Sequence, residues 1–240
     1  MIKKLTLLAS LAVSLSVHAT PVVNLFELGV AQGANAKYDE VARHNIHTSI
    51  TTETGTLAMY SVKSREQDNL AYMFEIYADE QAYQSHIASP QYRHFMDNAP
   101  QILGEHKQKI ALTPVFLGDK PFRQTRHTLT NLVVVDVKPE HHQAFAQVVV
   151  PTMTQSLAQE KDVLAMYAAT SVDMPNRWYF FEIYANQRAY DKHRATAHFK
   201  HYLANTADMV SDKHMIAINP SVLGSQGRTW FDALYHQPTP

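Results

Sequence analysis

The sequence predicts an α+β fold in which two homologous units follow one another in a single chain. Leu57 to Tyr60 recurs as Leu164 to Tyr167, and Phe74 to Ala78 recurs as Phe181 to Ala185, both at an offset of 107 residues. Over the 22 residues that start at Phe74, ten positions are identical in the second copy, with no gap. Self-similarity at one fixed offset indicates duplicated structural units.

Each unit is expected to begin with a strand that leads into a helix. Val22 to Leu28 and Leu129 to Val137 are rich in β-branched and apolar residues, which is typical of strands. Polar residues with a helical pattern begin near Ala36 in the first unit and near Glu140 in the second.

A hairpin is expected next in both units. Gly55 to Val62 and Leu70 to Tyr77 are predicted strands joined by the polar turn Ser64 to Asn69. In the second unit, the residues from Asp173 to Asn176, which include a proline, form the corresponding turn.

Two short helices are predicted after each hairpin. Asp79 and Asn186 stand where helix N-caps are expected, because Ala-, Gln- and Arg-rich helical sequence follows them. The second helix begins near Ser89-Pro90 in the first unit and near Thr196 in the second.

A last strand closes each unit, from Ile110 to Leu117 and from Met215 to Val222. The order of strand, helix, two strands, helices and strand is the ferredoxin-like layout, an antiparallel sheet with helices on one face. The bare faces of two such sheets can be buried against each other. We therefore expect two tandem ferredoxin-like domains that form a pseudo-dimer within the chain.

The N-terminus has the features of a secretory signal. Lys3 and Lys4 precede an apolar stretch from Leu5 to Val17, and small residues at Val17 and Ala19 predict cleavage after Ala19. The stretch is shorter than the roughly 20 apolar residues of a membrane span. We expect a periplasmic or secreted protein divided into a signal peptide (1–19), a first domain (20–119), a linker (120–128), a second domain (129–224) and a loose or draped C-terminal tail (225–240).

Composition narrows the class of partner. The chain has 21 Lys and Arg against 22 Asp and Glu, so no strong charge favours nucleic acid or an anionic membrane. It has no cysteine, which excludes disulfides, thiolate nucleophiles and cysteine-ligated metal sites. The sequence contains no Gly-x-Gly-x-x-Gly segment, the motif that would indicate a nucleotide cofactor.

The segment Phe-Glu-Ile-Tyr-Ala-x-x-x-Ala-Tyr-x-x-His-x-Ala occurs once in each unit and resembles the central motif of the antibiotic biosynthesis monooxygenase family. Glu53-x-Gly55-x-Leu57 is similar to the family's entry into the second strand, whereas the second unit has Glu160-Lys161-Asp162 without the glycine. The resemblance implies a dimeric α+β barrel with a pocket between helices and sheet. It also implies oxygenation of a small aromatic or quinol-type molecule by O₂ with neither flavin nor metal, so no cofactor is expected.

The candidate site residues are matched pairs at the repeat offset. An imidazole suits removal of a proton from an acidic phenol at neutral pH, and a strand carboxylate can be a pocket acid or base. The candidate catalytic residues are His86, His193, Glu75 and Glu182. Hydroxyl and amide groups can bind a quinone oxygen, and the candidate substrate-binding residues are Asn24, Asn131, Tyr77, Tyr184, Tyr83 and Tyr190. A capping or packing role for the histidines and a structural role for the glutamates are the alternatives.

Two histidine pairs have a spacing that places both rings on one helix face. His198 and His201, and likewise His44 and His47, are three residues apart. No third ligand with obvious spacing accompanies either pair, so we expect no metal site.

Three functions fit the resemblance. The first is a cofactor-independent monooxygenase, and the second is a non-catalytic protein that binds a small ligand in the same barrel. The second would be favoured if His86 and His193 were buried and hydrogen-bonded with no cavity beside them. Haem binding or degradation ranks third, because haem-degrading relatives carry a tryptophan where this chain has these histidines. The sequence leaves open whether two chains associate further.

Overall fold

A computed structural model describes residues 19–235, and the predicted signal segment up to residue 18 lies outside them. The first repeat has the predicted order of elements, with longer strands than the hydrophobic pattern indicates. Its elements are β1 (Val22–Val30), α1 (Asn35–Thr52), β2 (Thr56–Ser64), β3 (Leu70–Tyr77), α2 (Glu80–Ile87), α3 (Pro90–Ile102) and β4 (Leu103–Asp119).

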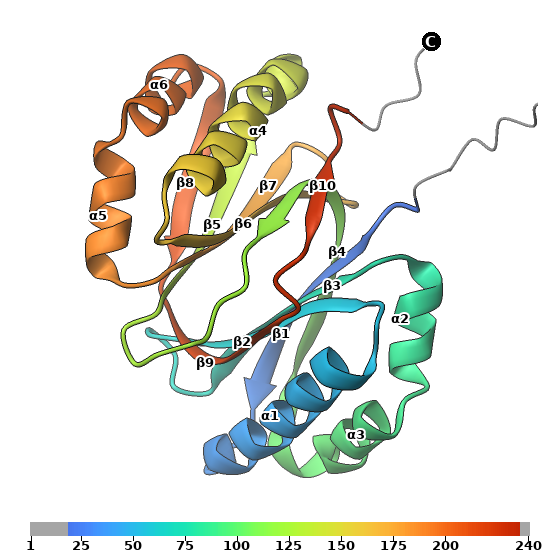
Figure 1. Cartoon of the computed structure of the whole chain (residues 1–240). Coiled ribbons are helices and arrows are strands. Elements are labelled where there is room, and N and C mark those ends of the chain that lie inside the picture. Colours follow the sequence, from blue (N-terminus) through green and yellow to red (C-terminus); the bar gives the residue numbers. More distant parts are fainter. Residues whose placement is uncertain (1–18, 236–240) are drawn as a thin grey trace, which may run out of the picture.

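The second repeat has the same order, and its last strand is divided in two. Its elements are β5 (Leu129–Val137), the short helix η1 (Pro139–His141), α4 (His142–Gln159), β6 (Val163–Ser171), β7 (Arg177–Tyr184), α5 (Gln187–Ala195), α6 (Ala197–Thr206), β8 (Val210–Ile216) and β9 (Ile218–Ser225). Figure 1 shows the helices of the two repeats on opposite outer sides of the molecule.

The two sheets are joined at their edges as well as packed face to face. The first part of β4 pairs with β1 of its own repeat, and its second part pairs with β6 of the other repeat. In the same way, β8 pairs with β5, and β9 pairs with β2. The result is one ten-stranded antiparallel sheet in the order β8-β5-β7-β6-β4-β1-β3-β2-β9, with β10 (Trp230–Asp232) attached to β4. The tandem ferredoxin-like fold is therefore as predicted, and the exchange of strand ends between repeats is an addition to it.

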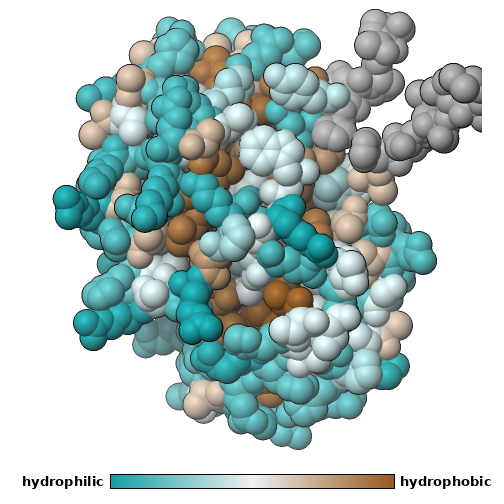
Figure 2. Space-filling view, viewed as in Figure 1, coloured by the Kyte–Doolittle hydropathy of each residue, from teal (hydrophilic) through white to brown (hydrophobic). Residues whose placement is uncertain are grey.

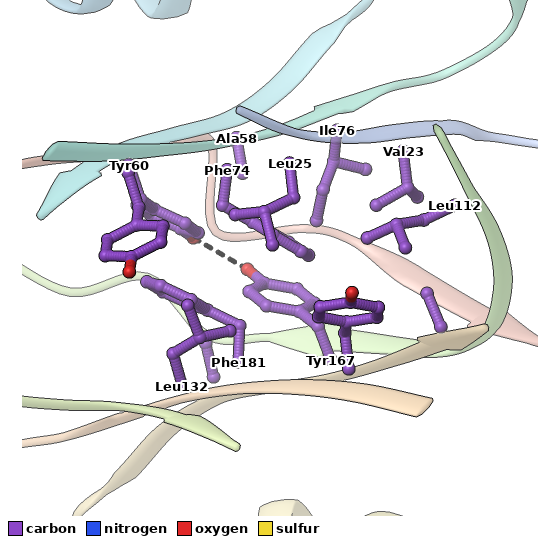
Figure 3. Packing of buried hydrophobic residues seen from close by; sticks show 14 of the residues in the cluster. Val23, Leu25, Ala58, Tyr60, Phe74, Ile76, Leu112, Leu132, Tyr167 and Phe181 are labelled. Atoms are coloured by element: carbon purple, nitrogen blue, oxygen red, sulfur yellow. Dashed lines mark hydrogen bonds between the residues drawn. The ribbon is translucent and has the colours of Figure 1, made fainter. Parts of the chain in front are cut away.

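Matched residues of the two repeats meet in the core between the sheets. The hydroxyls of Tyr60 and Tyr167, which are 107 residues apart, lie 2.7 Å from each other. The rings of Phe74 and Phe181 are stacked with centroids 5.0 Å apart and planes 8° apart. All four side chains are buried, and Figure 3 shows the residues of β1, β2 and β3 facing those of the second repeat. Neither repeat buries this sheet face alone.

Each repeat has its own second core between the sheet and its helices. In the first repeat it lies under α1 and α3 and includes Tyr38 and Phe95, and in the second it lies under α4 and includes Phe145 and Trp178. The face in Figure 2 is mostly hydrophilic, and its apolar surface gathers toward the middle, where the repeats meet. The space between sheet and helices is where a small-molecule pocket is expected in this layout.

The predicted N-caps are confirmed and fix the two helices that carry the candidate histidines. Asp79 accepts a hydrogen bond from the backbone N–H of Ala82 at 2.7 Å, and Asn186 accepts one from Ala189 at 3.0 Å. Such a cap stabilises a helix by about 1 kcal/mol. The caps therefore hold α2 and α5 in equivalent orientations against their sheets.

Part of the tail, which was expected to be loose or draped, lies against the first repeat. Trp230 to Asp232 form β10, which pairs with Gly118 to Phe116 of β4. Gly227 precedes it with a φ of +67°, a conformation that favours glycine, and a Cβ there would collide with the backbone of Pro121. Residues 19–235 contain no helix that is both long and apolar enough to cross a membrane.

Candidate functional site

His86 is held by a carboxylate that the sequence analysis did not include. Its Nδ1 lies 3.0 Å from Glu53 Oε2 and 3.3 Å from Ser49 Oγ, and its side chain is only 1% exposed. Glu53 is the C-cap that follows α1, and Thr56 and Gln91 also donate hydrogen bonds to it. Burial alone would raise the pKa of Glu53, but the hydrogen bonds from His86 and Thr56 outweigh it and hold the pKa below the usual value.

The second repeat has the same arrangement with one replacement. Glu160 ends α4 at the position of Glu53, and its Oε1 lies 2.9 Å from His193 Nδ1. His198 stands where the first repeat has Gln91, and its Nε2 lies 2.7 Å from the same carboxylate oxygen. The hydrogen bonds from both histidines hold the pKa of Glu160 below its usual value against the opposing effect of burial. Glu53 and Glu160 were not predicted as site residues. Both nevertheless stand in the segments that were compared with the family's entry into the second strand, and they are 107 residues apart.

The strand glutamates are hydrogen-bonded to the tyrosines two residues later, as the two-residue period of a strand requires. Tyr77 donates to Glu75 Oε2 at 2.8 Å, and Tyr184 donates to Glu182 Oε2 at 2.8 Å. Burial raises the pKa of Glu75, and the charges of His86 and Lys109 together with the Tyr77 hydrogen bond offset this only in part. Burial and the adjacent carboxylates keep both tyrosines protonated as hydrogen-bond donors.

The predicted asparagines lie across the sheet from these glutamates. Asn24 is paired with Glu75 and Asn131 with Glu182 in the strand register. Asn131 Nδ2 lies 3.4 Å from Glu182 Oε2, at the outer limit of a hydrogen bond. Asn24 is 2% exposed, and its Nδ2 has no hydrogen-bond partner among the described residues. The amide therefore extends the carboxylate–tyrosine pair to the neighbouring strand in the second repeat only.

The first repeat encloses the larger cavity of the two. It has a volume of about 490 Å³ and lies between the sheet and α1 and α3, with Glu75 and Tyr83 on its wall. The rest of the wall is mainly apolar and aromatic and includes Phe26, Met73, Tyr92 and Phe95. The wall of this cavity does not include His86, Asn24 or Tyr77. A ligand in the cavity would therefore contact Glu75 and Tyr83 but not these three residues.

The corresponding cavity of the second repeat has a volume of only about 70 Å³. Four of the predicted residues line it together: Asn131, Glu182, Tyr190 and His193. Tyr184 does not line it and acts through its hydrogen bond to Glu182. Val149 and Phe180 also form its wall, and they stand at the positions of the first repeat's Ala42 and Met73. Bulkier side chains therefore accompany the smaller cavity.

The comparison with family models matches the repeat. The model described as antibiotic biosynthesis monooxygenase matches residues 21–98 and, a second time, residues 128–205. This chain belongs to the antibiotic biosynthesis monooxygenase family. Both matches include the strand glutamate and the helix histidine of the repeat, so the family resemblance of the motif is confirmed.

Solved structures show the same tandem arrangement within the family. A "putative monooxygenase" from Lactobacillus acidophilus is 30% identical, with a TM-score of 0.84 over 89% of this chain and 100% of that one. A protein of the same description from Fusobacterium nucleatum is 24% identical, with a TM-score of 0.84 over 90% and 99% of the two chains. An anthrone oxidase-like protein is 11% identical, with a TM-score of 0.51 over 86% and 94%, which shows a shared fold alone. No curated protein matches the sequence.

The two sites of this family member differ in what they can do chemically. The first repeat combines a roomy apolar cavity with a buried carboxylate on its wall. The second repeat combines a narrow cavity with a cluster of two imidazoles on one carboxylate. The two repeats thus share the framework of the site and differ in cavity volume and in the residue beside the helix-capping glutamate.

Proposed function

We propose that the chain is a monooxygenase that acts with O₂ on a small aromatic, quinol-type substrate in the cavity of the first repeat. Membership in the family supports the reaction class. The observation that carries the proposal is Glu75, a carboxylate that is 8% exposed and lies on the wall of an apolar cavity of about 490 Å³.

Glu75 is suited to act as the general base. Burial raises its pKa, so its carboxylate holds a proton more strongly than one in water. A base whose pKa is nearer to neutral pH removes a proton from a weakly acidic hydroxyl more effectively than an ordinary carboxylate. The hydrogen bond from Tyr77 to Oε2 fixes the orientation of the carboxylate. This assignment moves the base from His86, the residue favoured by the sequence, to Glu75, because His86 is absent from the cavity wall.

The cavity has the size and lining of a small-molecule site. Its volume falls in the range of about 300 to 1,000 Å³ that is typical of such sites. Phe26, Tyr92 and Phe95 present aromatic surface to a flat ring, and Lys107 from β4 brings a positive charge to the wall. A cation there stabilises the oxyanion that forms when the substrate loses its proton.

The proposed reaction needs no external reductant. Glu75 takes the proton of the substrate hydroxyl, and the resulting anion transfers electrons to O₂. One oxygen atom forms a new C–O bond on the ring, and the other leaves as water. A quinol thereby becomes a hydroxyquinone, and the ring supplies all four electrons that O₂ accepts. The protein contributes the base, the positive charge and a site with little water.

Oxygen uptake with menadiol as the probe tests this proposal. We expect Glu75→Gln to lower the protein-dependent rate at least about 100-fold, which is the lower end of the usual contribution of a general base. Glu182→Gln is the matched control in the narrow site and is expected to keep most of the activity. The spontaneous oxidation of menadiol is measured without protein and subtracted. A wild-type rate in Glu75→Gln would overturn the assignment.

A second function, binding of a small aromatic ligand without turnover, is favoured by the environment of His86. This histidine is buried and hydrogen-bonded, and no described cavity touches it, whereas its counterpart His193 lines the small cavity of the second repeat. Equilibrium dialysis with menadione, the oxidised form of the probe, distinguishes the two functions. Binding that depends on the first cavity, with no protein-dependent oxygen uptake, would favour the binding protein over the enzyme.

We also propose that the chain is exported and processed after Ala19. The support is the two lysines and the apolar stretch at the N-terminus. Mass spectrometry of the protein from a periplasmic fraction tests it, since the expected N-terminal residue is Thr20. A mass that includes residues 1–19 would refute it.

A further inference from the structure

We propose that the second repeat binds a divalent transition-metal ion between Glu160, His193 and His198, and that the first repeat does not. The donor atoms of these three residues all lie within 4.8 Å of one another. This site is separate from Glu75 and from the proposed oxygenation in the first repeat.

The three donor atoms are already close to the spacing that an ion imposes. His193 Nδ1 and His198 Nε2 lie 2.9 Å and 2.7 Å from Glu160 Oε1. Ligands about 2.0 to 2.2 Å from a tetrahedral zinc ion lie roughly 3.3 to 3.6 Å from one another. The side chains therefore need to separate by only a fraction of an ångström to admit an ion in place of the two hydrogen bonds.

The backbone and the surrounding rings hold the three residues in place. Glu160 ends α4, His193 is in the last turn of α5, and His198 is in the first turn of α6 after the N-cap Thr196. These helices lie together on the outer side of the second repeat (Figure 1). The His193 ring contacts Tyr184 and Phe199, with centroids 5.5 Å and 4.8 Å away. Because the side chains are already ordered, binding an ion costs little conformational entropy.

Burial makes the cluster more favourable with an ion than without one. The side chains of His193 and His198 are 2% and 8% exposed, and that of Glu160 is 14% exposed. Without a metal, one carboxylate oxygen must accept from both imidazoles. A divalent ion takes the place of both hydrogens once each imidazole carries its proton on the other ring nitrogen, and it then binds the lone pairs of all three groups and offsets the charge of the carboxylate.

Access and nearby charge are also visible in the structure. A cavity of about 280 Å³ lies beside Glu160 and is lined by Asp162, Lys192 and Thr196, which gives the ion an entry route. Lys120 Nζ lies 2.7 Å from the backbone oxygen of Glu160, and Lys161 and Lys192 line the cavity, so these three cations oppose binding. Lys120 faces the carbonyl and leaves the carboxylate to the two histidines.

The first repeat shows what the same framework does without a third donor. Gln91 occupies the position of His198, and its amide nitrogen donates to Glu53 and to Ser49. A donating amide nitrogen does not bind a metal, so Glu53 and His86 provide only two ligands. The helix pair considered in the sequence is not the site, because His201 contacts Asn205 instead.

Two imidazoles and one carboxylate are typical of zinc and of other divalent ions of the first transition series. Three protein ligands leave at least one coordination position for water or another small ligand. Zn²⁺ is the probe of choice because it has no redox chemistry, and Co²⁺ reports tetrahedral geometry through its visible absorption.

The test uses the tag-free mature chain after removal of metal by a chelator. Isothermal titration with Zn²⁺ is expected to give about one ion for the wild type and none of comparable affinity for His198→Gln, which copies the ligand set of the first repeat. Since loss of an outer-shell partner alone costs about 10- to 100-fold in metal affinity, loss of a direct ligand is expected to cost at least as much.

Two further variants make the result decisive. Gln91→His, which builds the same three-residue set in the first repeat, is expected to bind about two ions, and His201→Gln is expected to bind one. Far-ultraviolet circular dichroism confirms that each variant is folded. A wild type that binds no Zn²⁺, or a His198→Gln variant that binds it with unchanged affinity, would overturn the proposal. Oxygen uptake in the first repeat is measured independently, so failure of one proposal does not imply failure of the other.

Discussion

The two repeats share a framework but differ in the residues that face their cavities. Both place a glutamate at the end of the long helix, a histidine in the next short helix, and a glutamate–tyrosine pair on the third strand. The cavity volumes are nevertheless about 490 Å³ and 70 Å³. The repeated motif therefore specifies packing and hydrogen bonds, whereas the two sites differ at a few positions, such as the one held by Gln91 in the first repeat and His198 in the second.

The largest effect is expected where the repeats contribute equally, in the shared core. Phe74→Ala and Phe181→Ala each remove a buried ring from the central stack and are expected to lower the free energy of unfolding by about 3 to 5 kcal/mol. Denaturant unfolding followed by two spectroscopic probes measures this. Values for the two variants that agree within about 1 kcal/mol, with a single transition, are expected of one joint core. Two separate transitions would show that the repeats unfold independently.

Two carboxylates of the first repeat, the partly exposed Glu53 and the buried Glu75, are expected to respond to pH in opposite ways. The folded-state pKa of Glu53 is lowered, so its stabilisation is present above its unfolded pKa near 4.5 and is lost as the pH falls through the folded value. Glu53→Gln is expected to cost about 2 kcal/mol at pH 7, because hydrogen bonds to a charged group are lost. This cost should shrink in acid, where the wild-type carboxylate is itself protonated.

Glu75→Gln is the matched control for that experiment. The folded-state pKa of Glu75 is raised, so the stability it contributes is full below its unfolded pKa and is lost as the pH rises through the folded value. The glutamine variant does not lose stability in this way as the pH rises. It is therefore expected to be at least as stable as the wild type at pH 7. Thermal unfolding at several pH values checks both variants, and equal pH dependence of the two would contradict the assignment.

The cavity difference can be tested by exchanging one wall residue. Met73→Phe gives the first repeat the residue that the second repeat has at Phe180. The larger ring is expected to raise the KM for menadiol by at least about tenfold, which corresponds to about 1.4 kcal/mol, with a smaller effect on kcat. Steady-state oxygen uptake measures this, and Phe180→Met is the reciprocal control. An unchanged KM in Met73→Phe would mean that the substrate does not occupy this cavity.

Local sequence signals predicted the elements, and long-range contacts account for what they missed. The N-caps Asp79 and Asn186 and the β-branched first strands were visible because a few neighbouring residues determine them. The early part of β4 was not predicted as a strand, because Glu105 to Lys109 are charged or polar and face solvent. Its second part pairs with β6, a contact between residues about 50 positions apart that no local pattern encodes.

The candidate site was predicted in part for the same reason. Glu75 and Tyr77 were both candidate site residues, and the two-residue period of their strand places them on one face, where they are hydrogen-bonded. It missed Glu53 and Glu160, because a carboxylate at the end of a helix resembles an ordinary surface residue. It also paired His198 with His201 along one helix, whereas the fold brings His198 to His193 across the junction between α5 and α6. Repetition at the offset of 107 residues was the signal that could have identified both glutamates.

The smallest expected effect concerns the point where the symmetry of the core is broken. Tyr167 donates to Asp119 Oδ2 at 2.9 Å, so Tyr60 is the donor in the hydrogen bond between the two hydroxyls. The end of β9 pairs with β2 of the first repeat, just as the end of β4 pairs with β6 of the second. Ser225 of β9 stands where β4 has Asp119, so only Tyr167 meets a carboxylate. Burial raises the pKa of Asp119 despite its hydrogen bonds, which makes each of those bonds important.

Tyr167→Phe therefore removes two hydrogen bonds, the one to the buried acid and the one between the two hydroxyls, whereas Tyr60→Phe removes only the latter. Hydrogen bonds to charged groups contribute about 1.5 to 3 kcal/mol and neutral ones about 0.5 to 1.5 kcal/mol. Tyr167→Phe is expected to be less stable than Tyr60→Phe by about 1 kcal/mol in denaturant unfolding at pH 7. Asp119→Asn should reduce that difference, since an amide in place of the carboxylate leaves Tyr167 with a neutral partner. Equal losses in the two phenylalanine variants would show that Asp119 does not distinguish the two halves of the core.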